Sequence, residues 1–440
     1  MKIQATALPA EITFGSWGRA LWVTAANSGY EKTKDDGSKS WENTVVTDIH
    51  QSWGGDAPRV GLAVGASTET VGFNVDFRSN GFDGITQGDN AYIWIKPLEM
   101  VKLSVGKMDD GTAATGAGFG LWDWDRLGCV NNGAGDGWTF GKYFQNNGVN
   151  VQVTPIEGLL VGLAVPLKLN EKEHEVATIT KDDDSTENYQ VGTLEDAWLN
   201  SAFVVAYDIQ QVGTVKAALK LHHVDSKTKY IWNEDEGPEL DFDDDGNFTG
   251  KFKTETTAEY YKDKDKKDVK TWCNIAAAFD LVSVENLFAS VGVEIPTLNT
   301  KPILANAYAC YGVSEQLAIH ALLGTQINKK DEKESAKKDK YETGLGFNVG
   351  VGVDFSLEES ILLQADVRYA NGVYMASTSA DNKDNLTLGV GAAKLFSNGS
   401  LGIAFEGSTN GYGRYSYEKE KDGSCKAFAW EIPVRFQYSF

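Results

Sequence analysis

The sequence predicts an all-β protein: a transmembrane antiparallel β-barrel of 18 strands, with 16 as the alternative count. Three observations lead to this prediction. Apolar residues recur at every second position, short and long connections alternate along the chain, and no uninterrupted apolar run of about 18 residues occurs. Lys and Arg total 41 against 62 Asp and Glu, and the formal net charge of −21 argues against a nucleic-acid partner.

Each expected strand has one apolar face and one polar or small face. Around residues 71–78, for example, Val71, Phe73 and Val75 alternate with Gly72 and Asn74. Runs of the same kind cover 59–67, 101–106, 149–154, 215–222, 345–355, 361–368 and 428–440. A soluble two-sheet sandwich or a solenoid would also show period 2. Neither would alternate short and long connections so regularly along the chain.

The connections favour a barrel with tight turns at one end and long loops at the other. Short turns are expected at 97–100, 155–158, 209–213, 281–285, 312–316, 356–360 and 395–400. Long connections are expected at 27–58, 79–89, 108–147, 167–199, 224–270, 326–343, 370–384 and 409–426. Both termini then fall on the short-turn side, which is the periplasmic side of such barrels. We therefore expect a periplasmic segment at 1–10 and a single barrel at 11–440.

Proline placement agrees with this layout. Eight of the nine prolines lie in connections or at strand ends, where a missing backbone N–H costs little. Pro433 lies inside the last strand and predicts a bulge or one lost ladder bond there.

The chain end resembles the C-terminal signal of bacterial outer-membrane β-barrels, because aromatic or apolar side chains occupy every second position up to the last residue. The matching residues are Ile432, Val434, Phe436, Tyr438 and Phe440. The segment 95–107 resembles the hairpin before the third loop of general porins, and 14–20 resembles spirochaete outer-membrane proteins. The resemblance to the porin superfamily implies outer-membrane lipid around the barrel and recognition by the barrel-assembly machinery. A homotrimer and a monomer both remain open.

In porins the loop after the fifth strand folds into the barrel and narrows it, and here that loop is 108–147. Its glycines permit close packing along a wall. Its expected constriction residues are Asp109, Asp110, Asp123, Asp125, Arg126 and Asp136. Carboxylates at a narrow passage favour cations. The alternative is that this loop lies outside the barrel with its charges solvated.

Charged residues in the inward phase of the strands are expected to form the pore wall: Arg19, Asp76, Arg78, Lys102, Lys216, Lys220, Asp366, Arg368 and Arg435. Trp122 and Trp124 flank Asp123 and either stack on a sugar ring or anchor the loop. The residues expected in the aromatic girdles at the membrane interfaces are Trp22, Tyr92, Trp94, Tyr311, Phe355, Tyr369 and Tyr438.

No residue pattern points to catalysis or to a cofactor. Asp241, Asp243 and Asp245 resemble the first half of a calcium loop, but Phe252 stands where its glutamate belongs, so a solvated acidic loop is the alternative. The cysteines, Cys129, Cys273, Cys310 and Cys425, form no zinc-like cluster in sequence.

The sequence therefore predicts an outer-membrane porin, not an enzyme, which passes ions and small hydrophilic solutes passively and favours cations. Two other functions remain open. One is a substrate-specific sugar channel, and the other is a barrel that serves mainly as a surface adhesin or antigen.

Overall fold

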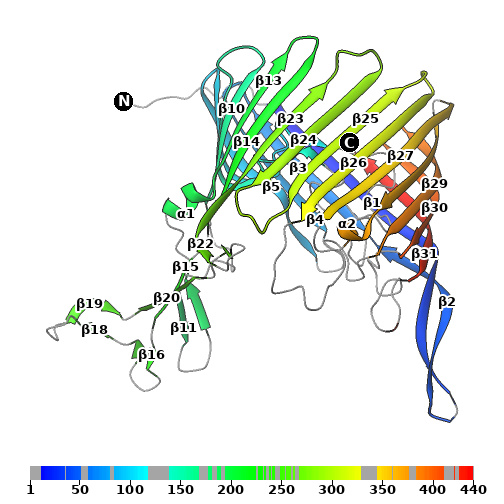
Figure 1. Cartoon of the computed structure of the whole chain (residues 1–440). Helices are drawn as coiled ribbons and strands as arrows, with labels where there is room; N and C mark the ends of the chain where they lie inside the picture. The colour runs from blue at the N-terminus through cyan, green and yellow to red at the C-terminus, as the bar shows by residue number, and fades with distance from the viewer. Residues whose placement is uncertain are drawn as a thin grey trace.

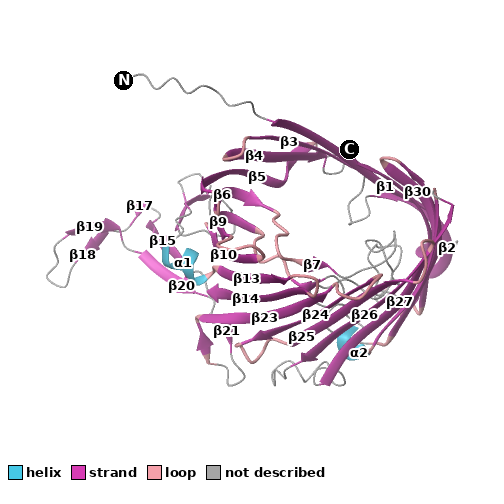
Figure 2. Ribbon diagram, turned by 90° about the horizontal axis from the view of Figure 1, so that it is seen from above, coloured by secondary structure: helices cyan, strands magenta, loops and turns pink. Residues whose placement is uncertain are grey.

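The computed structural model is a closed antiparallel barrel (Figures 1 and 2). It describes residues 11–439 apart from a set of gaps. These are 35, 51–57, 80–83, 117–137, 168–176, 181–185, 190–193, 224–225, 231, 234–236, 239, 243–247, 253, 259–260, 263–266, 329–343, 359, 376–382, 411–420 and 422–425.

Nineteen strands belong to the barrel sheet. They are β1 (Glu11–Thr33), β2 (Lys39–His50), β3 (Arg59–Ser67), β4 (Val71–Ser79), β5 (Ile85–Leu98), β6 (Val101–Met108), β9 (Asn146–Val153), β10 (Leu159–Pro166), β13 (Ala202–Ile209), β14 (Gly213–His223), β23 (Thr271–Leu281), β24 (Leu287–Pro296), β25 (Ile303–Gly312), β26 (Leu317–Asn328), β27 (Gly344–Glu358), β28 (Ile361–Ala370), β29 (Asn385–Phe396), β30 (Gly399–Thr409) and β31 (Phe428–Ser439).

The predicted count of 18 is confirmed, because β2 and β3 occupy one position in the barrel. Both pair with the same side of β1: β3 with Glu11–Arg19 and β2 with Leu21–Thr33. On its other side β1 pairs with β31, which closes the barrel. All other neighbours in the ring follow one another in chain order.

The expected loop at 27–58 is wrong in part, because β1 and β2 continue as a hairpin that extends past the neighbouring strands (Figure 1). Its tip turns at Gly37, whose φ of +77° suits glycine. The Trp41 indole lies over Gly29, so close that a Cβ on Gly29 would be 2.3 Å from it. Cross-strand packing of this kind stabilises a hairpin whose sequence is mostly polar.

Pro433 lies opposite an irregularity in the ladder, as predicted. Val23 faces Pro433 and Ala25 faces Ile432, so Thr24 is the extra residue of a bulge on β1. The Thr24 hydroxyl donates to the Ile432 carbonyl oxygen at 2.8 Å, which compensates in part for the interrupted ladder.

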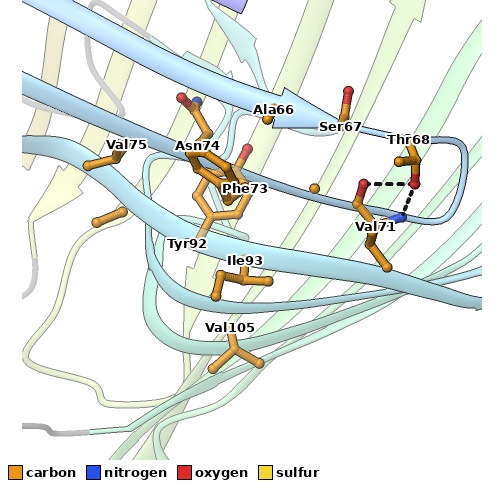
Figure 3. A pocket seen from close by; sticks show the side chains of 12 residues that line it. Ala66, Ser67, Thr68, Val71, Phe73, Asn74, Val75, Tyr92, Ile93 and Val105 are labelled. Carbon is orange, nitrogen blue, oxygen red and sulfur yellow. Dashed lines mark hydrogen bonds between the residues drawn. The ribbon is translucent and has the colours of Figure 1, made fainter. Parts of the chain in front are cut away.

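The short turns are closed by local hydrogen bonds. Between β3 and β4 the Val71 N–H donates to the Thr68 hydroxyl at 3.2 Å, and that hydroxyl donates to the Val71 carbonyl oxygen at 3.3 Å (Figure 3). At the opposite end lie the small helices α1 (Leu194–Leu199) and α2 (Gly372–Met375). In that region the chain also forms the short pairs β11 (Ala177–Thr180) with β12 (Thr186–Tyr189), and β15 (Ser226–Tyr230) with β20 (Thr254–Ala258).

The outer face of the barrel is apolar. Large side chains such as Ile93 (67% exposed) and Val291 (54% exposed) point outward from strands whose opposite faces are polar or small. Small outward residues leave shallow hollows between them. One hollow of about 610 Å³ is lined by Phe73, Val75, Ile93 and Val105 (Figure 3). Because apolar surface of this extent is stable only in an apolar medium, the outer face is suited to lipid.

Candidate functional site: the barrel lumen

The inner face of the barrel is polar where the outer face is apolar. On β23 and β24, Asp280 and Ser290 point inward and are buried, whereas their neighbour Val291 points outward. The Ser290 hydroxyl donates to Asp280 Oδ1 at 2.6 Å. This alternation places hydrogen-bonding groups on the inner wall.

The segment that follows β6 lies against this wall through Thr115, in the short strand β7 (Thr115–Gly116). The Thr115 hydroxyl donates to Asp280 Oδ2 at 2.6 Å. Lys216 Nζ lies 2.6 Å from the same oxygen and also donates to the Thr115 hydroxyl. Figure 2 shows β7 inside the ring of strands, beside β24. Thr115 is therefore hydrogen-bonded to both members of a buried ion pair that joins β14 to β23.

The strand β8 (Trp138–Phe140), which pairs with β7, lies on β24 and β25. The Thr139 hydroxyl is hydrogen-bonded to Ser290, and Asn306 Nδ2 donates to the Trp138 carbonyl oxygen at 2.9 Å. A Cβ on Gly292 would lie 1.7 Å from the Thr139 carbonyl oxygen. Only glycine therefore allows β8 to approach the wall so closely.

Tyr143 extends the contact beyond β8. Its hydroxyl donates to Glu294 Oε2 at 2.9 Å, and Asn274 Nδ2 donates to Glu294 Oε1 at 2.7 Å. Burial, and secondarily the nearby Glu294 carboxylate, raise the pKa of Tyr143 well above its usual range. The phenol is therefore a neutral donor throughout the physiological pH range.

An apolar cluster completes the attachment. Phe140, Tyr143 and Phe144 pack on small inward side chains of the wall, among them Ala164, Ala202, Ala218, Ala276 and Ala278. The Phe144 ring also lies directly over Gly162. Small wall residues leave the room that the three aromatic rings fill.

Two of the predicted constriction residues, Asp109 and Asp110, are held near β6 and β9. Lys142 Nζ lies 2.8 Å from Asp109 Oδ1, and Gln152 Nε2 donates to Asp110 Oδ2 at 2.9 Å. The Thr112 N–H donates to the other Asp110 oxygen at 2.9 Å. The remaining four, Asp123, Asp125, Arg126 and Asp136, lie outside the described residues, as do Trp122 and Trp124.

Four arginines, which we call the arginine group, gather on another part of the inner wall: Arg19, Arg59, Arg78 and Arg435. Arg19 and Arg59 face each other across β1 and β3. Arg78 Nη1 binds both carboxylate oxygens of Asp89, at 2.7 and 2.8 Å. In Figure 2, β1 and β3 lie across the ring from β7. The arginine group therefore faces the attached segment across the lumen.

The other predicted wall residues also lie in the inward phase. Asp76 accepts the Asp89 N–H at 2.8 Å, so its carboxylate is occupied by backbone. Lys102 Nζ lies 5.7 Å from the centre of the Trp94 ring. Arg368 is 2% exposed. The structure therefore distributes Lys220, Asp366 and Arg368 around the ring and does not gather all of the predicted residues at one point.

The girdle assignment is wrong for Tyr92 and Trp94. They alternate with the outward Ile93 and Ile95, and Trp94 faces the lumen with Asn74 and Gly65. The alternation along this strand in the sequence places both rings on the inner face. Nearness to a strand end was the less reliable criterion for assigning them to a girdle. Tyr311 and Tyr438 do have outward, partly exposed rings.

Sequence reasoning missed the residues that attach β7 and β8: Thr115, Thr139, Asp280 and Gly292. Asp280 shares its inward phase with Ala276 and Ala278, so its orientation was readable. Its pairing with Lys216 and Thr115 depends on how the segment crosses the lumen, which no local pattern encodes.

Within the described part of the chain, no three His, Cys, Asp or Glu side chains come together to hold a metal ion. Of the calcium-loop candidates, Asp243 and Asp245 lie outside the described residues, and so does the side chain of Asp241. Cys273 and Cys310 are free thiols, whereas Cys129 and Cys425 lie outside the described residues. Among the described helices, none is long and apolar enough to span a membrane.

Residues 230–400, less than half of the chain, match the OmpA-like transmembrane domain family. Comparison with curated protein sequences gives no significant match. Similar solved structures include OpdQ of Pseudomonas aeruginosa (8% identity, 98% of each chain covered, TM-score 0.46) and the anion-selective porin of Comamonas acidovorans (11% identity, 98% of this chain and 100% of that chain, TM-score 0.39). OmpT of Vibrio cholerae is similar at 10% identity, 99% of each chain and a TM-score of 0.39.

Proposed function

We propose that this transmembrane β-barrel of the outer-membrane porin type forms a water-filled channel for passive diffusion of ions and small hydrophilic solutes. The observation that carries the proposal is the polar inner wall, against which β7 and β8 are held by the Asp280 and Ser290 contacts. A segment fixed inside the barrel narrows the lumen without needing to move. We propose no chemical step and no cofactor.

We further propose a preference for cations. The chain carries a net charge of −21, and the segment 108–147 has five aspartates against one arginine and one lysine. Negative charge beside a narrow aqueous passage raises the local concentration of cations. The arginine group on the facing wall opposes this effect, so the preference for cations is modest. The electric field across the lumen runs from the arginine group to the acidic segment.

The outer face is then covered by lipid, and the alternating residues from Ile432 to Phe440 are the surface that we expect the assembly machinery to bind. A homotrimer is compatible with this proposal, and so is a monomer.

Single-channel recording of the refolded barrel in a planar bilayer tests the function. We expect stable steps proportional to salt, and a reversal potential of cation-selective sign under a tenfold KCl gradient. Asp110→Asn should reduce the selectivity, whereas Asp36→Asn, in the hairpin tip outside the barrel, should not. A heat-modifiable barrel without conductance steps would refute the channel. An anion-selective reversal potential would refute only the cation preference and would assign control of the field to the arginine group.

A further inference from the structure

A cavity of about 380 Å³ opens on the inner wall near the short-turn end of the barrel. Its floor consists of Gly15, Ala63 and Gly65, and its sides include Asn74 and Trp94, on β4 and β5. The hollow exists because the floor residues have little or no side chain. A Cβ on Gly65 would lie 2.7 Å from the Thr13 hydroxyl, at the edge of the same cavity. The volume is within the range of small-molecule sites.

The polar groups around this cavity are available to a solute. Within the described part of the chain, the Thr13 hydroxyl, the Asn74 amide and the Trp94 indole N–H have no protein hydrogen-bond partner. Together they offer donors and acceptors on two sides of a hollow. Such a set matches a molecule that carries several hydroxyl groups.

One side of the cavity combines an aromatic ring with positive charge. The Trp94 ring lies over Gly72, where a Cβ would be only 2.7 Å from it, so the ring lies close to the wall. Lys96 and Lys102 Nζ are 5.8 and 5.7 Å from the ring centre. Two carboxylates of the neighbouring wall are already engaged: Asp89 with Arg78, and Asp76 with backbone N–H groups. The two lysines therefore place positive charge beside the Trp94 ring.

We propose that this cavity is a binding subsite for small hydroxylated carboxylates of monosaccharide size, such as sugar acids. The solute's hydroxyls bind Asn74 and Thr13, its ring contacts Trp94, and its carboxylate lies near Lys96 and Lys102. The subsite deepens the proposed channel function and rests on it, because the solute reaches the cavity through an open lumen.

A purely structural role is the alternative, in which Trp94 only covers Gly72. The chain supplies a matched control for it. Trp17 covers Gly61 on the same inner wall, with a Cβ of Gly61 only 2.3 Å from its indole, yet Trp17 does not line the cavity. A structural role predicts that the two tryptophans behave alike, whereas a binding role singles out Trp94.

The test is block of single-channel current by glucuronate added on the short-turn side, with glucose as the neutral comparison. We expect saturable block by glucuronate at lower concentration than by glucose. Trp94→Leu should raise the half-blocking concentration at least about fivefold. Lys102→Met should raise it about threefold for glucuronate and leave glucose unchanged. Trp17→Leu should change neither.

Asn74→Ala serves as a second variant should Trp94→Leu fail to fold, and it should weaken block about threefold. Equal effects of Trp17→Leu and Trp94→Leu, or block that does not saturate, would overturn the subsite. Equal block by glucose and glucuronate would overturn the role of the lysines. If the folded barrel does not conduct, the channel proposal fails by itself. Equilibrium dialysis of radiolabelled glucuronate against the detergent-folded barrel then decides on the subsite separately.

Discussion

Asp280→Ala should detach the segment that carries β7 and β8 from the inner wall. The Asp280 carboxylate receives hydrogen bonds from Thr115 and Ser290 and pairs with Lys216 at 2.6 Å. Lys216 is 5% exposed, so water cannot replace its partner without rearrangement. Removing one member of a buried ion pair costs about 3–5 kcal/mol, because the other charge is left buried and unpaired. Both members of this pair belong to the wall, so that cost falls on the barrel as a whole. The segment itself loses the hydrogen bond from Thr115 to a charged group, worth about 1.5–3 kcal/mol. That loss lowers the ratio of attached to detached segment by about tenfold to 100-fold.

Two measurements follow from this magnitude. Urea unfolding of the refolded barrel should show a loss of about 3–5 kcal/mol, and single-channel current at neutral pH should become noisier as the segment moves. Asp208→Ala removes an exposed carboxylate at the end of β13 and should change neither quantity. The double variant Lys216→Met with Asp280→Leu leaves no buried charge and should recover most of the lost stability. Unchanged stability and unchanged current noise in Asp280→Ala would refute Asp280 as the attachment point of the segment.

Three further predictions test other parts of the fold. Gln211, in the turn between β13 and β14, has a φ of +65°, so Gln211→Gly should stabilise the barrel by about 1 kcal/mol in urea unfolding; a loss of stability would contradict this. Val291→Arg places a charge on the outer face and should lower the free energy of unfolding in liposomes by about 2–4 kcal/mol. Gln364→Arg, on the inner face, should lower it by about 1 kcal/mol. Equal losses would contradict the assigned faces. The raised pKa of Tyr143 means that its stabilising contribution is complete below pH 10 and is lost as pH rises above it. Tyr143→Phe should therefore show a smaller alkaline change in single-channel current than the wild type, and identical pH profiles would exclude this role.

Much of the barrel could be predicted from the sequence, because alternate residues of a membrane-spanning strand face lipid and lumen. The apolar set therefore faces outward and the polar set faces inward. Val291 and Asp280 follow that rule, and Pro433 marked the irregular ladder position. The rule does not extend beyond the membrane. The hairpin of β1 and β2 was missed because its packing, such as Trp41 on Gly29, is a cross-strand contact between polar runs.

The candidate site was less readable, for a physical reason. Strand phase gives the face on which a side chain lies, and this phase assigns Arg19, Lys216 and Arg435 to the inner face. Which of them meet depends on how the chain crosses the lumen between β6 and β9. The contacts of Thr115 with Asp280, and of Thr139 with Ser290, join residues more than 150 positions apart. No local pattern contains such information.

The bulge at Thr24 has a consequence for how the two ends of the chain find each other. The pairing of β1 with β31 joins residues some 400 positions apart, whereas the other neighbouring strands are much closer in sequence, so loop-closure entropy favours forming this pairing last. Two free edges of a sheet can meet in several registers, because backbone groups repeat every two residues. Pro433 has no N–H to offer and faces the one place on β1 where the ladder is already interrupted. A two-residue slip would set Pro433 against a regular ladder position and lose a hydrogen bond. The bulge and the proline together therefore favour a single register between β1 and β31.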